Sequence, residues 1–300
     1  MSVLVQYYNW AMNDASDPRT KHWLLMSSPW PATALTALYL YIVWKGPTWM
    51  EKRQAFSLKN ILVLYNFVLV LLSAYMTWEF FASSVLEPGF SLVCQPVDYS
   101  ESPAAVRLAS ICWLYFFSKI IEFMDSFFFI LRKKTSQISF LHVYHHSTMV
   151  VLWWVGVRFV PGGESYFSAM INCLIHVLMY AYYMLSAMGP HMQKYLWWKK
   201  YMTSLQLLQF FLIVFHTAVA YYKDCGYPNS YNIALIAYSF SHILLFSNFY
   251  QKTYRRKGTH QVTSGDKASI DITSHKDQNG NCKQDGFHEL ANGLGSKKLM

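Results

Sequence analysis

The stretch that decides the fold is residues 61–83, ILVLYNFVLVLLSAYMTWEFFAS, where Glu79 is the only charged side chain. As a helix rising 1.5 Å per residue it would be about 35 Å long, enough to cross a hydrocarbon core of about 30 Å. It therefore predicts a transmembrane helix. Six further apolar stretches have a similar length: residues 24–44, 108–131, 138–157, 165–188, 201–222 and 231–251. The stretch at 24–44 is the weakest, because four residues interrupt it: Ser27, Ser28, Pro29 and Pro31.

The composition agrees with a membrane protein. Hydrophobic residues make up 54% of the 300-residue chain and charged residues only 14%, whereas soluble domains carry about 25% charged residues. Of the 41 charged residues, 14 lie in the last fifty, which leaves the rest of the chain still poorer in charge. Nucleic-acid binding is excluded, because the lysines and arginines fall between apolar stretches and in the tail rather than on one face. We therefore expect an all-α membrane protein with seven transmembrane helices.

Charge in the short loops predicts the orientation, because Lys and Arg concentrate on the cytosolic side. Basic residues follow the first, third, fifth and seventh stretches, and the intervening loops are acidic or balanced. This alternation predicts a luminal N-terminal segment at 1–23, a transmembrane domain at 24–254 and a disordered cytosolic tail at 255–300. Lys297 and Lys298, at the fourth and third positions from the C-terminus, predict a dilysine retrieval signal and hence a multi-pass protein of the endoplasmic reticulum.

The third stretch carries ionisable side chains, which are costly in hydrocarbon and usually functional. Lys119 and Glu122 are three residues apart, and Ser126 lies on the same helical face with Asp125 beside it. The Lys–Glu spacing also fits an ion pair with a purely structural role. Both a structural and a functional role therefore remain open for Lys119. We favour a functional role for Asp125.

The fourth stretch begins with three histidines on one helical face: His142, His145 and His146. Clustered imidazoles suit either a metal site or catalysis as acid, base or nucleophile. A packing role alone is a poor explanation for three histidines on one stripe. The two chemical interpretations remain open at this point.

Polar stripes also follow the fifth and sixth stretches. They consist of Asn172, His176, Met179, Tyr180 and Tyr183, and of Thr203, Gln206 and Gln209. By helical rise the histidines, Asp125 and the glutamines lie roughly 5–15 Å below the cytosolic surface, with His176 slightly deeper. We expect one buried chamber that opens to the cytosol between basic residues at its rim: Lys133, Lys134, Lys199, Lys200, Arg255 and Arg256. Such a chamber suits a substrate with an anionic head and a long apolar tail. His216 and His242 follow no such pattern and are interpreted as structural.

Over residues 20–255 the chain resembles the very-long-chain fatty acid elongase (ELO) family. The resemblance rests on four motifs: Lys119-Ile-Ile-Glu122-Phe-Met-Asp125-Ser126, the His142 to His146 box after Gln137-Ile-Ser-Phe-Leu, Asn172 to Tyr183, and Thr203-Ser-Leu-Gln206-Leu-Leu-Gln209. Ser126 departs from the Thr usual in the family but keeps a hydroxyl. The box and residues 196–200 look most like the branch acting on polyunsaturated and very-long chains.

The resemblance implies the first step of microsomal fatty acid elongation. A long-chain acyl-CoA condenses with malonyl-CoA to give 3-oxoacyl-CoA, CO2 and free CoA, and the cycle is completed by reductases and a dehydratase that associate with the family. It also implies seven helices of which the second to the seventh form an inverted barrel around a closed-ended acyl tunnel. A homo-oligomer is left open. The substrate-binding residues would be Lys119, Glu122, Gln137, Tyr180, Tyr183, Gln206, Gln209 and the four rim lysines.

For the chemistry we expect a ping-pong route in which His145 or His176 accepts the acyl group, because imidazole can attack a thioester. His142, His146 and Asn172 would orient the reactants and stabilise developing negative charge. Asp125 would hold a histidine tautomer. Neither a metal nor another cofactor is required, and no suitable catalytic thiol is present.

Two rivals come from other classes. A His-box di-iron desaturase or hydroxylase would need more histidine ligands than the four clustered here. A non-enzymatic lipid transporter or receptor would have no reason to bury histidines, Lys119, Glu122 and Asp125 at one depth.

The five cysteines predict one disulfide. By the predicted orientation Cys94 and Cys225 face the oxidising lumen, Cys112 and Cys173 lie in spans, and Cys282 is in the cytosolic tail. We expect a Cys94–Cys225 bond that clamps the luminal ends of the helices.

Overall fold

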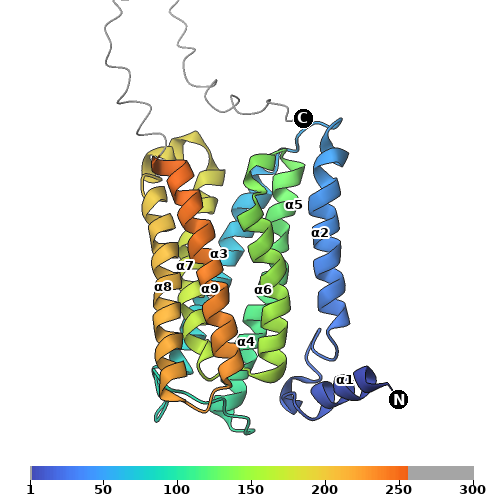
Figure 1. Cartoon of the computed structure of the whole chain (residues 1–300). Coiled ribbons are helices and arrows are strands. Elements are labelled where there is room, and N and C mark those ends of the chain that lie inside the picture. The colour runs from blue at the N-terminus through green and yellow to red at the C-terminus, as the bar shows by residue number, and fades with distance from the viewer. Residues whose placement is uncertain (1, 256–300) are drawn as a thin grey trace, which may run out of the picture. The chain divides into compact units, whose positions relative to one another are not determined.

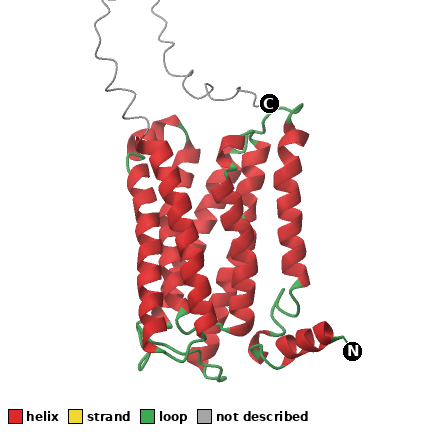
Figure 2. Cartoon of the chain, viewed as in Figure 1, coloured by secondary structure: helices red, strands yellow, loops and turns green. Residues whose placement is uncertain are grey.

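The computed structural model describes residues 2–255, and this part of the chain is helical with no strand (Figure 2). The helices are α1 (Val3–Asn13), α2 (Trp30–Met50), α3 (Lys59–Ala82), α4 (Pro103–Ile121), α5 (Phe123–Leu131), α6 (Phe140–Phe159), α7 (Ser165–Met188), α8 (Lys199–Lys223) and α9 (Asn229–Tyr250) (Figure 1). Short helical turns occupy Pro18–Thr20, Thr135–Gln137, Pro190–Tyr195 and Gln251–Arg255. The predicted retrieval signal, Lys297 and Lys298, lies outside the described residues, as do Arg256 and Cys282.

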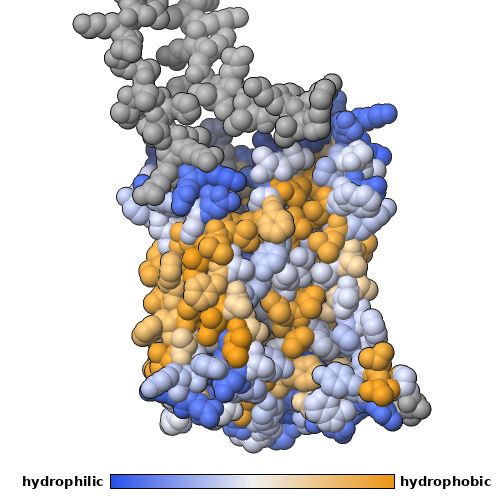
Figure 3. Space-filling view, in the orientation of Figure 1, coloured by the Kyte–Doolittle hydropathy of each residue, from blue (hydrophilic) through white to orange (hydrophobic). Residues whose placement is uncertain are grey.

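Five segments of the described chain are long and apolar enough to cross a membrane: Lys59–Ala82, Pro103–Leu131, Ser165–Met188, Lys199–Lys223 and Asn229–Thr253. Figure 3 shows an apolar band between two hydrophilic ends. Helices α2 and α6 have 21 and 20 residues but do not meet the same hydropathy criterion. In α6 the histidines and Arg158 lower the hydropathy. The five segments therefore indicate a multi-pass membrane protein.

The first predicted span begins later than residue 24. Trp30 is the first residue of α2, with Pro29 at the N-cap and Pro31 in the first turn. Proline fits this position because its missing N–H would have no helical partner there. Residues 24–29 form turns instead, so the whole helix is displaced toward Met50.

Six of the long helical segments pack in a closed order. Each contacts the next in the sequence α3, α7, α8, α9, α6, α4 and back to α3, while α2 packs from outside against α5 and α6. In Figure 1 the long helices run side by side and α1 lies crosswise to them, below the end of α2. We call the end with the loops 83–102, 160–164 and 224–228 the disulfide end. The opposite end, with the loops 51–58, 132–139 and 189–198, is the basic end.

Helices α4 and α5 form one span that is interrupted at Glu122. The Asp125 N–H bonds to the Glu122 carbonyl, a tighter i, i+3 bond in place of the α-helical one. Glu122 is 2% exposed. The interruption thus coincides with the ionisable residues inside the span.

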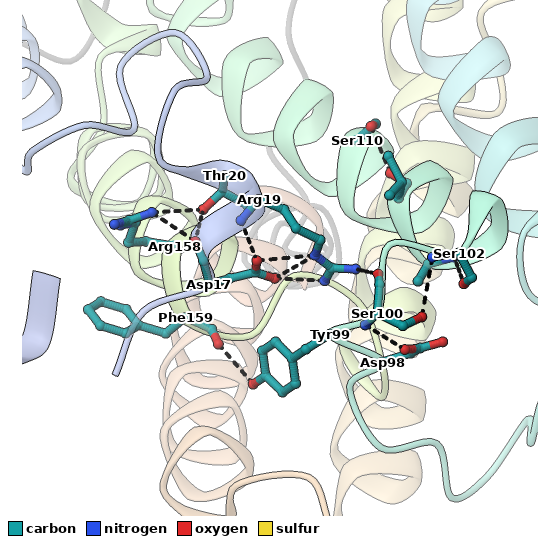
Figure 4. Close-up of polar contacts among 12 residues, drawn as sticks. Asp17, Arg19, Thr20, Asp98, Tyr99, Ser100, Ser102, Ser110, Arg158 and Phe159 are labelled. Carbon is teal, nitrogen blue, oxygen red and sulfur yellow. Dashed lines mark hydrogen bonds and ion pairs between the residues drawn. The ribbon is translucent and has the colours of Figure 1, made fainter. Parts of the chain in front are cut away.

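The N-terminal segment is fastened to α6 by a buried arginine (Figure 4). The Arg158 guanidinium, 1% exposed, donates to the carbonyl oxygens of Asp17 and Met12 at 2.9 and 2.7 Å and to the Thr20 hydroxyl at 3.2 Å. Arg19 forms an ion pair of 2.7 Å with the Asp17 carboxylate. A buried charge is tolerated only with such hydrogen bonds, so residues 12–20 and the end of α6 depend on each other.

Cys94 and Cys225 form a disulfide in the structure, with their Cα atoms 5.0 Å apart. The bond joins the loop before α4 to the loop before α9. Cys112 and Cys173 are buried free thiols within α4 and α7. The disulfide therefore joins the two cysteines that the predicted orientation placed on one side.

A buried carboxyl group lies beside this disulfide. Glu164 accepts a hydrogen bond from the Gln95 backbone N–H and lies 3.4 Å from Nδ1 of His216. Burial raises the pKa of Glu164 above its ordinary value. His216 also bonds to the Leu92 carbonyl through Nε2 at 2.8 Å, so this loop is tied to both α7 and α8.

Candidate active site

A cavity of about 560 Å³ opens at the basic end and brings the predicted site residues together. Its lining includes Glu122, Asp125, Gln137, His142, His145, His146, Asn172, His176, Tyr183, Lys199, Gln206 and Gln209. These residues come from α5, α6, α7 and α8 and from the adjoining loops. Helical spacing puts the polar residues of each helix on one face, and the packing of the helices turns these faces toward the same cavity.

Lys119, Glu122 and His176 form a connected group at the inner wall. Lys119 Nζ is 2.9 Å from Glu122 Oε1, and His176 Nδ1 is 3.3 Å from the same oxygen. A carboxylate oxygen only accepts, so Nδ1 of His176 carries the proton and Nε2 has the lone pair. The Lys–Glu pair is thus both an internally neutralised pair and the support of His176.

Asn172 presents its amide in one orientation. Its Oδ1 accepts hydrogen bonds from Tyr115 Oη at 2.6 Å and from Lys119 Nζ at 3.2 Å. With the carbonyl oxygen so occupied, the NH2 group is the end left for the cavity that Asn172 lines. An NH2 donor at this place can stabilise an oxyanion.

Asp125 does not hold a histidine in this structure. Its Oδ2 accepts a hydrogen bond of 2.9 Å from Tyr180 Oη, and Glu122 is the carboxylate that supports His176. Both carboxylates contact α7, and the interruption of the span at Glu122 decides which of them lies beside His176. Tyr180 is not among the described lining residues of the cavity, but it binds Asp125, which lines it.

The motif position occupied by Ser126 links His142 to a helix outside the ring. Ser126 Oγ lies 2.8 Å from His142 Nε2 and 3.0 Å from Tyr39 Oη. Tyr39 belongs to α2, is 1% exposed and stacks on Phe123 at 4.1 Å between ring centres. Tyr39 escaped the sequence prediction because it lies more than eighty residues before the motif.

His145 and His146 differ in their surroundings. His145 Nδ1 lies 3.2 Å from Nε2 of His242, which comes from α9 and is fully buried. His146 is 8% exposed and packs between His142 and His145, with ring centres 4.3 and 5.5 Å away. His242 therefore has a hydrogen-bond partner on α6 that the sequence pattern did not reveal. A polar Ser241-His242 pair in an apolar span was the available signal.

A second cavity, of about 350 Å³, continues toward the disulfide end. The two cavities share four lining residues, His145, Asn172, Gln209 and Phe210. The second is lined mainly by apolar and aromatic side chains, including Met149, Leu152, Trp153, Ile213, Leu235 and Tyr238. His145 therefore stands where a polar space meets an apolar one.

One of the four predicted rim lysines, Lys199, is among the described lining residues of the cavity. Lys199 and Arg132 line the cavity, but Lys133, Lys134 and Lys200 are not among its described lining residues. Lys133 donates instead to the Glu51 carbonyl at 2.9 Å, from a backbone with φ of 56°. The sharp turn after α5 directs the neighbouring Arg132 to the cavity.

The ring nitrogens are engaged with separate partners: His142 with Ser126, His145 with His242 and His176 with Glu122. Among the described residues no three His, Cys, Asp or Glu side chains converge as a set of metal ligands. The geometry is that of hydrogen-bonded imidazoles facing a cavity, which suits acid, base or nucleophilic chemistry.

Comparison with known proteins agrees with the motifs. Residues 24–262 match the family described as ELO, GNS1/SUR4 family. Over 251 residues the chain is 50% identical to "Very long chain fatty acid elongase 4" of Homo sapiens, covering 84% of this chain and 79% of that protein. It is 47% identical over 285 residues to "Very long chain fatty acid elongase 7" of Rattus norvegicus, covering 94% and 96%. With most of its length matched and the motif residues gathered at one cavity, the chain belongs to the ELO family.

Proposed function

We propose that this protein is a fatty acid elongase acting as a 3-oxoacyl-CoA synthase, an acyltransferase. It condenses a long-chain acyl-CoA, of the polyunsaturated or very-long-chain class, with malonyl-CoA and releases CO2 and CoA. The observation that carries the proposal is the position of His145 and Asn172 where the cavity at the basic end meets a more apolar one, with His176 in the wall of the first cavity. A thioester at that junction would place its CoA toward the basic end and its chain toward the disulfide end.

The reaction follows a ping-pong course. His145 or His176 accepts the acyl group, free CoA leaves past Lys199 and Arg132, and malonyl-CoA enters by the same route. Decarboxylation gives an enolate that attacks the acyl-imidazole, and the Asn172 NH2 group stabilises the oxyanion. His142 and His146 orient the reactants, while Gln137, Tyr183, Gln206 and Gln209 contact the substrate within the cavity. No step passes through a metal or another cofactor.

Formation of labelled 3-oxoacyl-CoA from radiolabelled malonyl-CoA by the purified protein tests the activity. We expect the product only when a long-chain acyl-CoA is also present. A panel of acyl-CoAs then defines the preferred chain length and unsaturation. Desaturation or hydroxylation of the acyl chain instead, or binding without turnover, would contradict the proposal.

We further propose seven spans, with α2 and α6 crossing beside the five clearly apolar segments. Six of them then surround a tunnel closed at the disulfide end, which faces the lumen of the endoplasmic reticulum, and the C-terminus is cytosolic. The closed packing order of α3, α7, α8, α9, α6 and α4 supports this arrangement. A tag at the N-terminus should be protected from protease in sealed microsomes. Digestion of that tag without detergent would show that α2 does not cross.

A further inference from the structure

His242 is the buried imidazole that the motifs leave out. It lies on α9, whereas Glu122 and His176 come from the α4–α5 span and from α7, and it is 0% exposed. Both of its ring nitrogens have partners: Nδ1 is 3.0 Å from the Tyr238 carbonyl oxygen, and Nε2 is 3.2 Å from His145 Nδ1. A merely space-filling ring would not need two aligned polar contacts.

These two contacts fix the tautomers of both histidines. The Tyr238 carbonyl can only accept, so Nδ1 of His242 carries its proton. A neutral His242 then has its lone pair on Nε2 and must accept from His145. It follows that His145 donates from Nδ1 and keeps its own lone pair on Nε2, at the other edge of a ring that lines both cavities.

The partner of His145 differs in kind from that of His176. His176 donates to the Glu122 carboxylate, which stabilises a cationic imidazolium ring. His145 donates to a neutral imidazole, which can remove its Nδ1 proton. An acyl-imidazole is neutral only if that proton leaves, so the two pairs suit different tasks.

We propose that His242 is the positioning residue of His145, setting its tautomer and receiving its Nδ1 proton while His145 carries the acyl group. This inference rests on the proposed elongase function. Nε2 of His145 forms a bond to the thioester carbon, the carbon–sulfur bond breaks, and its electron pair leaves with the CoA thiolate. The Nδ1 proton moves to Nε2 of His242, and the thiolate takes a proton from water at the open basic end. When the enolate later attacks the acyl carbon, His145 leaves as an imidazolate and takes its proton back from His242.

The surroundings of His242 suit a proton held for a short time. Phe210 stacks on the ring at 5.0 Å, and the ring of Tyr238 lies 4.3 Å away, both measured between ring centres. Burial disfavours a permanent charge, whereas aromatic faces attract a cation. His242 is therefore neutral at rest, as the tautomer assignment requires, and has partners for the charged state.

The test compares His242→Phe, His242→Gln and His216→Phe. Phenylalanine keeps the ring packing but accepts no hydrogen bond. Glutamine offers an amide oxygen to His145 Nδ1 but takes up no proton. His216→Phe is the matched control, because His216 is also a hydrogen-bonded imidazole stacked on a phenylalanine, Phe167, at 4.2 Å, and lines neither cavity.

The readouts are the rate of CoA release from acyl-CoA alone, the site of the acyl adduct by peptide mass analysis, and KM. We expect wild-type protein to carry the adduct on His145. His242→Phe should release CoA about 100-fold or more slowly, and His242→Gln should lie between it and wild type. KM for acyl-CoA should stay within about twofold in all variants, because His242 acts through another residue. His216→Phe should keep the wild-type rate of CoA release even if its melting temperature falls.

Wild-type CoA release in His242→Phe, or an adduct on His176, would overturn this inference and leave the elongase function standing. If His242→Phe does not fold, His242→Gln decides, and full turnover in that variant would refute proton transfer to His242. Turnover by wild-type protein without any adduct would refute both the ping-pong course and this inference. Absence of 3-oxoacyl-CoA from every wild-type reaction would instead refute the proposed function.

Discussion

The two ends of the helical bundle are held together in opposite ways. At the disulfide end, Cys94–Cys225 joins two loops covalently, and Arg158 fastens the N-terminal segment to α6. At the basic end, Lys134 and Lys200 are exposed beside an open cavity. In the proposed reaction two CoA-bearing substrates enter and leave at the basic end, so that end must be able to open, whereas the disulfide end can stay fixed. We infer that contacts at the disulfide end mainly stabilise the fold, whereas residues of the cavity at the basic end carry the chemistry. Substitutions at the two ends test this separation.

The largest effect is expected at two histidines that line the cavity of the basic end, His145 and His176. His145→Ala and His176→Ala should each lower kcat by about 10²–10⁴-fold, because each removes a group acting on the reacting atoms. The melting temperature should change little by comparison. His191→Ala, an exposed histidine of the basic end, is the control and should retain activity. If either variant unfolded instead of remaining folded and inactive, the separation of stability and chemistry between the two ends would be refuted.

Removal of the disulfide should have the next largest effect, now on stability. The bond closes a separation of 131 residues, for which the chain-entropy estimate is about 4–5 kcal/mol, less any strain. We expect Cys94→Ser with Cys225→Ser to lower the melting temperature clearly while KM for acyl-CoA changes little. Reductant should lower the melting temperature of wild-type protein and have no further effect on the double variant. Alkylation of both cysteines in unreduced wild-type protein would contradict the bond.

A smaller effect is expected at the cavity mouth. Removing the charges of Lys199 and Arg132 together should raise KM for acyl-CoA and malonyl-CoA alike, by about 3–10-fold, because a partly exposed ion pair contributes about 1 kcal/mol or less. Added salt should narrow the difference from wild type, since contacts at an open rim are screened. The matched pair, Lys133→Ala with Lys200→Ala, should leave both KM values near wild type. Equal effects from both pairs would show that the whole basic end attracts CoA, as the sequence suggested.

The smallest effect concerns pH at the disulfide end. The pKa of Glu164 is raised by burial, so its contribution to stability is present below the unfolded value of about 4.3 and lost as pH rises through the folded value. Glu164→Gln imitates the protonated form and can donate to Nδ1 of His216. We expect it to match wild-type melting near pH 4.5 and to exceed it at pH 7.5, by about 1 kcal/mol or less. Glu101→Gln, an exposed glutamate of the same end, should show no such divergence. A constant difference across this pH range would refute the assignment.

Local pattern was sufficient for much of the fold. Apolar length predicted the helices, and the spacing of His142, His145 and His146 put them on one face, which the structure turns into the cavity. Pairing across distant helices was not predictable, because a single polar side chain in an apolar stretch does not reveal its partner. His242 and Tyr39 are of this kind.

The sequence also could not predict which of two neighbouring carboxylates binds a histidine. Glu122 and Asp125 are both on the inner part of one span, and only the helical turn at Glu122 decides which supports His176. Similarly, four lysines looked equivalent at the rim. The backbone turn after Leu131 sends Lys133 away and brings in Arg132.

The Arg158 contact also bears on how the chain is made. Its partner Asp17 precedes it by 141 residues, and ribosomes add roughly 5–20 residues per second. The N-terminal segment must therefore wait roughly 7–30 s after its own synthesis before α6 can reach it. During that interval the groups that later bind Arg158 lack this partner, and α2, α3, α4 and α5 are synthesised before the contact can form. If α6 is inserted while the N-terminal segment is not beside it, the Arg158 guanidinium is left unpaired at the end of the helix. An unpaired charge there is a feature by which quality control could distinguish unfinished from finished molecules.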